Sequence, residues 1–465
     1  MAALLMPAFT LAQPQPSDRS SAGLNDNLLA SSLEELTQIQ ITSVARHQES
    51  LLQAAASVYV ITADDIHRSG ATTLPEVLRL APTLQVARID SVQYAITARG
   101  FNNTIGNKLL VLIDGRTVYT PMFSGVFWEM QDTMLEDIDR IEVISGPGAT
   151  LWGANAVNGV INIITRPVAP HESTLVSADA GNQEQGAAVR GGGTLDGDVR
   201  WRAYARTRRW DETELESGAP VLNRYQRQQA GFRADWQRGS DDFTLQGDVF
   251  DGESEQRGTV GTITIPPLEG SGANLLARWD RHWSADSSLQ VQAYWNHNDR
   301  REFVLFSPES DIYDIELQQN FALGSHRLVW GGGYRLGEDD VGDGFITGLR
   351  PQQSNLEWKD VYLQDEFPLA ANLKLTTGLK LEWNDYTGME YLPTLRLGWT
   401  VSANDFLWAA ASRAVRAPSR YDRDVYFPQN PPYIVAGGPN FVSEVAKVYE
   451  VGYRGLIGSA LQLSV

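Results

Sequence analysis

The stretch IEVISGPGATLWGANAVNGVINIITRP, residues 141–167, spaces its glycines much as a phosphate-binding turn does. A P-loop, however, needs a lysine and a Ser/Thr after its second glycine, and a dinucleotide-binding turn needs a third glycine three positions on. Neither follows Gly146 and Gly148, because Ala149 and Thr150 come next and position 151 is leucine. The later run VNGVINIIT is rich in Val and Ile, which favours a strand over a helix. We therefore predict strand, glycine turn, strand, and no bound nucleotide.

Other chemistry is equally sparse in this sequence. The chain has 0 Cys and 6 scattered His, so no metal site, cofactor site or nucleophile–base pair has recognisable spacing. The formal net charge of -19 argues against nucleic acid as a partner. We predict that the protein is not an enzyme, holds no metal and binds no cofactor.

Composition points instead toward a membrane β-barrel. The chain carries 13 Trp, 16 Tyr and 41 Gly among 465 residues, with a mean hydropathy of -0.27. It has no apolar run of about 18 residues, the minimum for a membrane helix. A chain rich in aromatic residues and glycine but without such runs is typical of outer-membrane barrels.

The N-terminus indicates export. Residues 1–12 form an apolar run that ends in small residues at Thr10 and Ala12, and QPQPSD follows. This pattern predicts the remnant of a signal peptide cleaved after Ala12, with the true start upstream because a basic region is missing. A disordered apolar tail is the alternative. Residues 13–44 are expected to be flexible.

Residues 45–167 predict a compact α+β domain. Thr62 with Asp65, and Thr73 with Glu76, form capping-box patterns that open short helices over 63–69 and 74–80. Strands are predicted at SVYVIT, LQVARI, YAITARGF, KLLVLIDGR, DRIEVIS and VNGVINIIT.

Residues 168–465 follow a different pattern, with apolar and polar residues alternating over about ten positions. In LKLTTGLKLEW, for example, leucines alternate with Lys374, Lys380 and Glu382. Short turns alternate with longer segments at about 210–225, 251–271, 300–311, 337–357, 384–391 and 415–444. An outer-membrane barrel has this alternation, whereas a soluble carbohydrate-binding sandwich has no need of it.

We count about fourteen full strands and a fifteenth that begins at LQLSV. An open sheet edge cannot face lipid, so we expect the barrel to continue beyond this sequence.

The motifs SVYVITADDIHRSGATTLPEVLRLAPTLQV, ITARGF, LLVLIDGRTVY and IEVISGPGATLWGANAVNGVINIITR resemble the plug domain of TonB-dependent outer-membrane receptors. ASRAVRAPSR and SEVAKVYEVGYR resemble segments of that family's barrel. The resemblance implies a membrane β-barrel of about 22 strands, of which about fourteen are present, with an N-terminal α+β plug inside its lumen. It also implies that the glycine turn belongs to the plug, where Gly100, Gly146, Gly148, Gly153 and Gly159 allow tight turns and close approach.

The resemblance further implies a charge cluster between plug and barrel. Arg99 matches a plug arginine of the family, and Glu444 and Glu450 match barrel glutamates. The family's second basic residue is replaced by Ser145 here, so the resemblance implies that one positive charge of the cluster is missing. We hypothesise that Arg99 pairs with one of the two glutamates, because an unpaired buried charge is costly. The alternative is an arginine solvated in a wet lumen.

For the contact with TonB, the inner-membrane energising protein, the candidate is TQIQITSV. This TonB box would comprise Thr37, Gln38, Ile39, Gln40, Ile41, Thr42, Ser43 and Val44. The segment is short, β-prone and alternating, so it suits recognition by strand addition while being disordered at rest. An ordinary linker or a first plug strand is the alternative.

Candidate ligand contacts are Tyr119, Phe123, Phe127 and Trp128 of the plug, and Arg420 and Tyr421 in the longest loop. The aromatic rings suit planar groups of a ferric siderophore, and the arginine suits an anion. Packing between plug and wall, or simple loop closure over the site, would explain them equally.

The implied function is active uptake of a scarce extracellular ligand, foremost a ferric siderophore, by a monomer in the outer-membrane lipid of a Gram-negative bacterium. Cobalamin and an oligosaccharide stay open as ligands, as does a role as phage or toxin receptor. A passive porin would not need the plug, and an outer-membrane hydrolase would need a nucleophile that the sequence does not offer.

Overall fold

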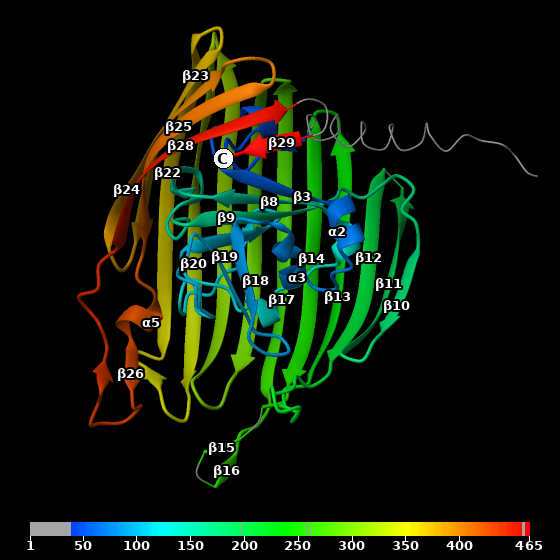
Figure 1. Cartoon of the computed structure of the whole chain (residues 1–465), viewed down its shortest axis with the longest axis vertical. Helices are drawn as coiled ribbons and strands as arrows, with labels where there is room; N and C mark the ends of the chain where they lie inside the picture. Colours follow the sequence, from blue (N-terminus) through cyan, green and yellow to red (C-terminus); the bar gives the residue numbers. More distant parts are fainter. Residues whose placement is uncertain (1–38, 197, 257, 261, 458–460) are drawn as a thin grey trace, which may run out of the picture.

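The computed structural model describes residues 39–196, 198–256, 258–260, 262–457 and 461–465. Its frame is an antiparallel sheet of 15 strands that curves around a smaller inner domain, the plug (Figure 1). Neighbours in the sheet are neighbours in the chain. The strands are β10 (Leu175–Ala180), β11 (Glu184–Leu195), β12 (Val199–Trp210), β13 (Tyr225–Arg238), β14 (Asp241–Ser254), β17 (Leu268–Ser284), β18 (Ser287–Arg301), β19 (Phe306–Leu323), β20 (His326–Asp343), β22 (Gln353–Ala370), β23 (Leu373–Asn384), β24 (Gly388–Thr400), β25 (Asp405–Arg416), β28 (Glu444–Ile457) and β29 (Leu461–Ser464). The predicted fifteenth strand at LQLSV is therefore confirmed.

The two faces of this sheet have the polarity of a membrane barrel. On β23 the side chain of Lys380 is 4 % exposed and faces the plug, whereas neighbouring Leu379 is 43 % exposed on the outside. Arg202 on β12 is likewise buried inward, where its guanidinium donates to the carbonyl oxygen of Arg166. A soluble sandwich would bury its leucines and expose its charges, so the inverted pattern supports the barrel.

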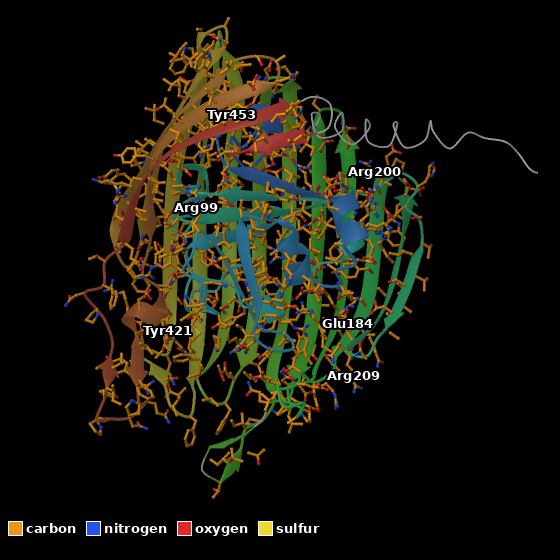
Figure 2. All side chains as sticks on the ribbon, in the orientation of Figure 1. Arg99, Glu184, Arg200, Arg209, Tyr421 and Tyr453 are labelled. Carbon is orange, nitrogen blue, oxygen red and sulfur yellow. The ribbon has the colours of Figure 1, made fainter. Side chains whose placement is uncertain are left out.

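Long and short connections lie at opposite ends of the barrel. The longer ones, 211–224, 255–267, 344–352 and 417–443, share the lower end in Figure 1, which we call the loop end. The opposite end, the turn end, has the short connections such as 239–240 and 324–325. Figure 2 shows Arg200 and Arg209 at these two ends of β12.

Two connections at the loop end differ from prediction. The expected long segments at 300–311 and 384–391 are reduced to 302–305 and 385–387, because the flanking strands extend further than the bilayer requires. Small elements occupy the remaining loops: β15 (Thr259–Val260), β16 (Ile263–Thr264), β21 (Gly348–Leu349), α5 (Arg420–Arg423), β26 (Val425–Phe427) and β27 (Val435–Ala436).

The plug is an α+β domain around a five-stranded sheet. Its order is β3 (Val58–Thr62), β8 (Ile138–Ser145), β9 (Gly159–Thr165), β6 (Leu109–Ile113) and β7 (Arg116–Thr117), with β6 and β9 parallel. A hairpin of β4 (Leu84–Arg88) and β5 (Tyr94–Ala98) lies beside it, and 3₁₀ turns cover Leu51–Gln53, Trp128–Met130 and Leu135–Asp137. Ile61, Ile141 and Ile161 are fully buried in its core. Among the described residues, the helices are all too short or too polar to span a membrane.

One of the two predicted plug helices forms as expected. Helix α2 (Ala63–Ser69) has the reciprocal capping box of Thr62 and Asp65. Helix α3 (Leu74–Val77) ends early and continues as a 3₁₀ turn, η2 (Leu78–Leu80), and Thr73 makes no capping hydrogen bond through its side chain. The second capping box was wrong because the Glu76 carboxylate accepts hydrogen bonds from Arg79 and Tyr94 instead.

The glycine turn also differs in one detail. A single helical turn, α4 (Ala149–Trp152), lies between β8 and β9 where we predicted no helix. It contacts β23, β24 and β25, and the Thr150 hydroxyl donates to the carbonyl oxygen of Leu392 at 2.8 Å. The turn therefore packs against the barrel wall, which explains its apolar sequence.

Candidate ligand-binding site and plug–barrel contacts

An aromatic pocket of about 300 Å³ opens between the plug and the loop end of the barrel. Phe123 and Phe127 of the plug meet edge to face at 4.9 Å, and Phe306 of β19 meets Tyr421 of α5 edge to face at 6.0 Å. Its aromatic lining is Tyr94, Phe123, Phe127, Trp128, Phe306 and Tyr421. Rings contributed by both plug and barrel offer flat apolar surface to a ligand that reaches this end.

Three charged residues line the aromatic pocket. The Arg300 guanidinium stacks on the Phe127 ring, 4.4 Å from its centroid, and its Nε lies 3.0 Å from the Glu129 carboxylate. A second nitrogen of Arg300 pairs with the Glu302 carboxylate. The arginine is therefore neutralised on both sides inside the wall.

Four of the six predicted ligand contacts line this pocket: Phe123, Phe127, Trp128 and Tyr421. Tyr119 does not, because it is buried deeper, where its hydroxyl accepts a hydrogen bond from Arg335 at 2.8 Å. Burial raises the pKa of Tyr119.

Arg420 does not line the pocket either, and its expected role as an anion contact is corrected by its burial. It is 0 % exposed and pairs with Asp339 at 2.9 Å and with Asp424 at 3.1 Å. A guanidinium fully enclosed by two carboxylates and two backbone carbonyls is a structural element of the loop.

Sequence analysis missed Arg300, Glu302 and Phe306. They lie in the segment predicted as a long loop, in which β18 and β19 instead continue almost to one another. The run RREFVLF, residues 300–306, with charges beside aromatic residues at a strand end, was the available signal.

The charge cluster lies higher in the barrel than the aromatic pocket (Figure 2). Arg99 of the plug pairs with Glu450 of β28 and donates to the carbonyl oxygen of Ser145 at 2.7 Å. Glu444 lies 3.2 Å from Lys108 Nζ of the plug and 2.6 Å from Arg416 Nε of the wall. The structure thus brings all three expected residues into contact with plug–barrel partners and adds Lys108, which the motif comparison did not indicate.

Gly146 is the glycine on which this cluster depends. Its φ of 128° is in the region that favours glycine, and a Cβ there would lie 2.8 Å from a Glu450 carboxylate oxygen. Gly100 and Gly153 also have positive φ, and Gly148 and Gly159 pack so tightly that a Cβ would clash with Val160 and with the Ile144 carbonyl.

The N-terminal candidate segment is docked against the plug from Ile39 onward, whereas Thr37 and Gln38 lie outside the described residues. Strand β1 (Gln40–Ile41) pairs with β2 (Glu49–Ser50), and Ile41 is 0 % exposed. The expectation of flexibility through residue 44 is therefore wrong for residues 39–44.

The physical reason is Glu142, a fully buried carboxylate of β8. It accepts backbone N–H bonds from Thr42 at 3.0 Å and from Ser43 at 2.8 Å, besides its ion pair with Arg140. These charge-assisted hydrogen bonds hold the segment in an extended form.

Side chains of the barrel donate hydrogen bonds to backbone carbonyl oxygens of the next segment, residues 44–56. Arg396 donates to Val44, Gln364 to Ala45 and Gln318 to Arg46, at distances of 3.0, 3.4 and 2.9 Å. Arg454, which is 2 % exposed, donates to the carbonyls of Leu51, Ala54 and Ala56. Donors from four strands thus fix this segment near the turn end through its backbone.

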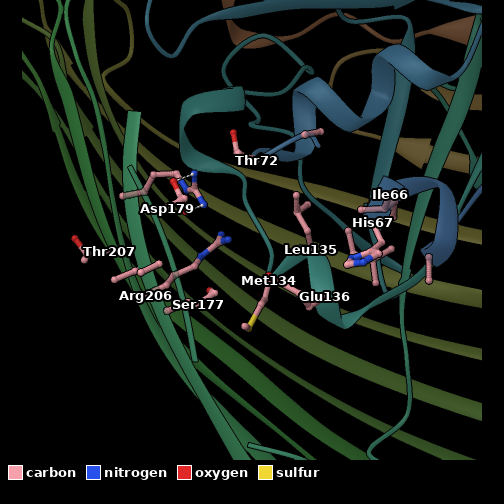
Figure 3. Close-up of a pocket in the computed structure, with 17 residues that line it drawn as sticks. Ile66, His67, Thr72, Met134, Leu135, Glu136, Ser177, Asp179, Arg206 and Thr207 are labelled. Atoms are coloured by element: carbon pink, nitrogen blue, oxygen red, sulfur yellow. Dashed lines mark hydrogen bonds and ion pairs between the residues drawn. The ribbon is translucent and has the colours of Figure 1, made fainter. Parts of the chain in front are cut away.

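A second cavity, of about 380 Å³, lies between α2, the 134–136 turn and strands β10–β12 (Figure 3). It has no Phe, Tyr or Trp in its lining, and both of its arginines are paired: Arg206 with Asp132 at 2.6 Å and Arg208 with Asp179 at 3.2 Å. Within the described ranges, no cluster of His, Asp and Glu could hold a metal ion.

A plug inside a large polar-lined barrel, with a pocket at one end and a docked segment at the other, defines a plugged outer-membrane barrel of the receptor class. The chain belongs to the TonB-dependent receptor family: residues 50–160 match the TonB-dependent receptor plug domain, and residues 171–465 match the TonB-dependent receptor-like β-barrel. Members of this family are outer-membrane receptors and transporters.

Among curated proteins, the chain is 25 % identical to the ferric enterobactin receptor PirA of Pseudomonas aeruginosa, over 86 % of this chain and 63 % of that protein. It is 26 % identical to the vitamin B12 transporter BtuB of Photobacterium profundum, over 91 % of this chain and 68 % of that protein. The chain thus spans slightly under two thirds of PirA and slightly over two thirds of BtuB.

Solved structures show the same fold. The siderophore receptor PirA from Pseudomonas aeruginosa superposes with a TM-score of 0.66 at 20 % identity, covering 86 % of this chain and 72 % of that one. A mutant of the ferric enterobactin receptor PfeA from the same organism gives 0.72 at 16 % identity, covering 92 % and 70 %.

Proposed function

We propose that this receptor binds a scarce extracellular ligand at its loop end and imports it across the outer membrane with energy supplied through TonB, and that the ligand is a ferric siderophore. The observation that carries the proposal is the placement of the aromatic pocket at one end of the plug and the docked N-terminal segment at the other. Outer-membrane barrels turn their long loops outward and their short turns toward the periplasm, so the pocket faces the medium and the segment faces TonB.

The TonB contact is assigned to Thr37–Val44. Strand addition by TonB needs a free backbone edge, and β1 offers its unpaired side once the Glu142 contacts open. Residues 45–167 would form the plug and residues 168–465 the wall, which meets lipid as a monomer.

Cobalamin is a second candidate ligand, favoured by the match to BtuB over 91 % of this chain. The two curated relatives described above lend no comparable support to an oligosaccharide. A passive pore is disfavoured because the plug occupies the lumen, and catalysis is disfavoured because the aromatic pocket's lining contains no Ser, Cys or His.

The test is accumulation of radiolabelled ferric siderophores and of labelled cobalamin in cells that lack their own receptors for these compounds and express this one. We expect accumulation of one compound that disappears without TonB or with a proton uncoupler. Accumulation that persists without TonB would identify a passive pore and overturn the proposal.

A further inference from the structure

We propose that the aromatic pocket selects a ligand without net negative charge, so that it accepts an uncharged or cationic iron hydroxamate or corrinoid and discriminates against a trianionic iron catecholate. This inference rests on the proposed function and specifies its ligand class. It is carried by the way in which the charges of the pocket are paired.

Only three charged side chains reach the pocket among the residues that the structure describes: Glu129, Arg300 and Glu302. Two carboxylates against one guanidinium leave one negative charge. Arg300 is 6 % exposed at its side chain and Glu129 equally so, which places their pair in a poorly screened environment. An anion that reached for Arg300 would have to displace a carboxylate and leave it buried without a partner.

The long loop does not offset this charge. Arg420 is enclosed by Asp339 and Asp424, and Arg416 is paired with Asp422 at 2.6 Å. Arg423, the other arginine of α5, donates to the carbonyls of Tyr386 and Pro439 and does not line the pocket. Within the described loop 417–443, no guanidinium is directed at the pocket.

The apolar part of the pocket lining also favours a ligand without net negative charge. Six aromatic rings, joined by Met122, Val126 and Ile105, offer contact to uncharged faces of a ligand. A cation gains in addition from the ring faces and from Glu302, whose side chain is 15 % exposed. An anionic ligand would be repelled by the net negative charge of the pocket. Repulsion of the wrong ligand in this way is a common source of binding specificity.

The test measures equilibrium binding of four probes to the purified receptor: a monocationic iron trihydroxamate, an uncharged cyclic iron trihydroxamate, uncharged cyanocobalamin and a trianionic iron tris-catecholate. We expect at least one of the first three to bind about tenfold or more tightly than the catecholate. The two hydroxamates and cyanocobalamin distinguish an iron ligand from a corrinoid. Tightest binding by the catecholate, or binding by none of the four, would overturn the inference.

A matched pair of variants ties the selectivity to the pocket. Glu302→Gln removes one carboxylate partner of Arg300, so the ratio of catecholate to hydroxamate affinity should rise about fivefold or more. Glu309→Gln removes the same charge from an exposed position on β19, and should leave the ratio unchanged. An unchanged ratio in Glu302→Gln would show that pocket charge does not select the ligand.

Binding and transport separate the two proposals. A probe that binds with the expected charge preference but accumulates without TonB overturns the transport proposal alone. A catecholate that binds most tightly and accumulates only with TonB overturns the charge inference alone.

Discussion

Lys108 Nζ lies 3.2 Å from the Glu444 carboxylate, and Arg99 pairs with Glu450 on the same barrel strand, β28. Lys108 immediately precedes β6, whereas the basic residue that the family motif leads one to expect would stand at position 145, the last residue of β8. The plug thus presents two cations to two barrel glutamates although Ser145 carries no charge. The second positive charge reaches the cluster from a different strand.

The Lys108–Glu444 pair should contribute to plug stability. Because Glu444 is 51 % exposed at its side chain, Lys108→Ala should lower the free energy of plug unfolding by only about 1 kcal/mol. The measurement is urea unfolding of the plug, followed by a spin label at Gln85→Cys in a chain with 0 native Cys. A double-mutant cycle with Glu444→Ala should show a coupling energy of about 0.5–1 kcal/mol.

Arg68→Ala is the control, since it removes an exposed plug cation from an i,i+4 pair on α2 and should cost less. Zero coupling between Lys108 and Glu444 would refute the stabilising role.

Glu142 should control release of the N-terminal segment. Glu142→Gln keeps the size of the side chain but removes the charge that accepts from Thr42 and Ser43. Hydrogen bonds to charged groups contribute about 1.5–3 kcal/mol, so the mobile fraction of a spin label at Gln40→Cys should rise roughly tenfold or more. Glu136→Gln, an exposed plug carboxylate, should leave the label immobile. Equal spectra for both variants would show that Glu142 does not hold the segment.

The same docking should weaken as pH rises. Burial raises the pKa of Glu49 in β2 to about 7 from an ordinary 4.5, with Lys374 opposing the shift. The docked state therefore binds the proton more tightly than the released state. The free energy that favours docking over release decreases as pH rises from about 4.5 through about 7. The loss is at most about 3 kcal/mol and is complete above that window.

The measurement is the mobile fraction of the label at position 40 between pH of about 5 and 8. Glu49→Gln should flatten this dependence because it cannot titrate. A mobile fraction that rises equally with pH in Glu49→Gln would assign the effect to another group.

Tyr421 should contribute directly to ligand binding. Tyr421→Ala removes a ring that lines the pocket and packs on Phe306, so the dissociation constant of the transported complex should rise roughly 5- to 30-fold, or about 1–2 kcal/mol. Tyr433→Ala is matched in loop, residue type and exposure but lies outside the pocket, and should change affinity little. Comparable losses in both variants would indicate a general effect of loop order instead.

Local patterns predicted the elements well where propensity and packing agree. Thr62 and Asp65 specify the start of α2 through bonds within four residues, and the alternation in LKLTTGLKLEW specifies which face of β23 meets lipid. Prediction failed where a competing partner prevails, as at Thr73, whose expected partner Glu76 bonds to Arg79 and Tyr94. It failed again at the end of β18, because strand length in the loops depends on cross-strand pairing with β19.

The sequence by itself determined the plug, the polarity and order of the barrel strands, and the residues Arg99, Glu444 and Glu450, because period-two alternation and motif identity are local properties. The tertiary structure decided which of the predicted side chains line the pocket and which are enclosed by other residues. It places Phe127, Trp128 and Tyr421 in one pocket, encloses Arg420 between two aspartates and docks Ile39–Val44 on Glu142. Contacts such as those of Glu142 with Ser43 and of Arg420 with Asp339 join residues tens of positions apart, and the burial that fixes their energies exists only once plug and wall have closed around them.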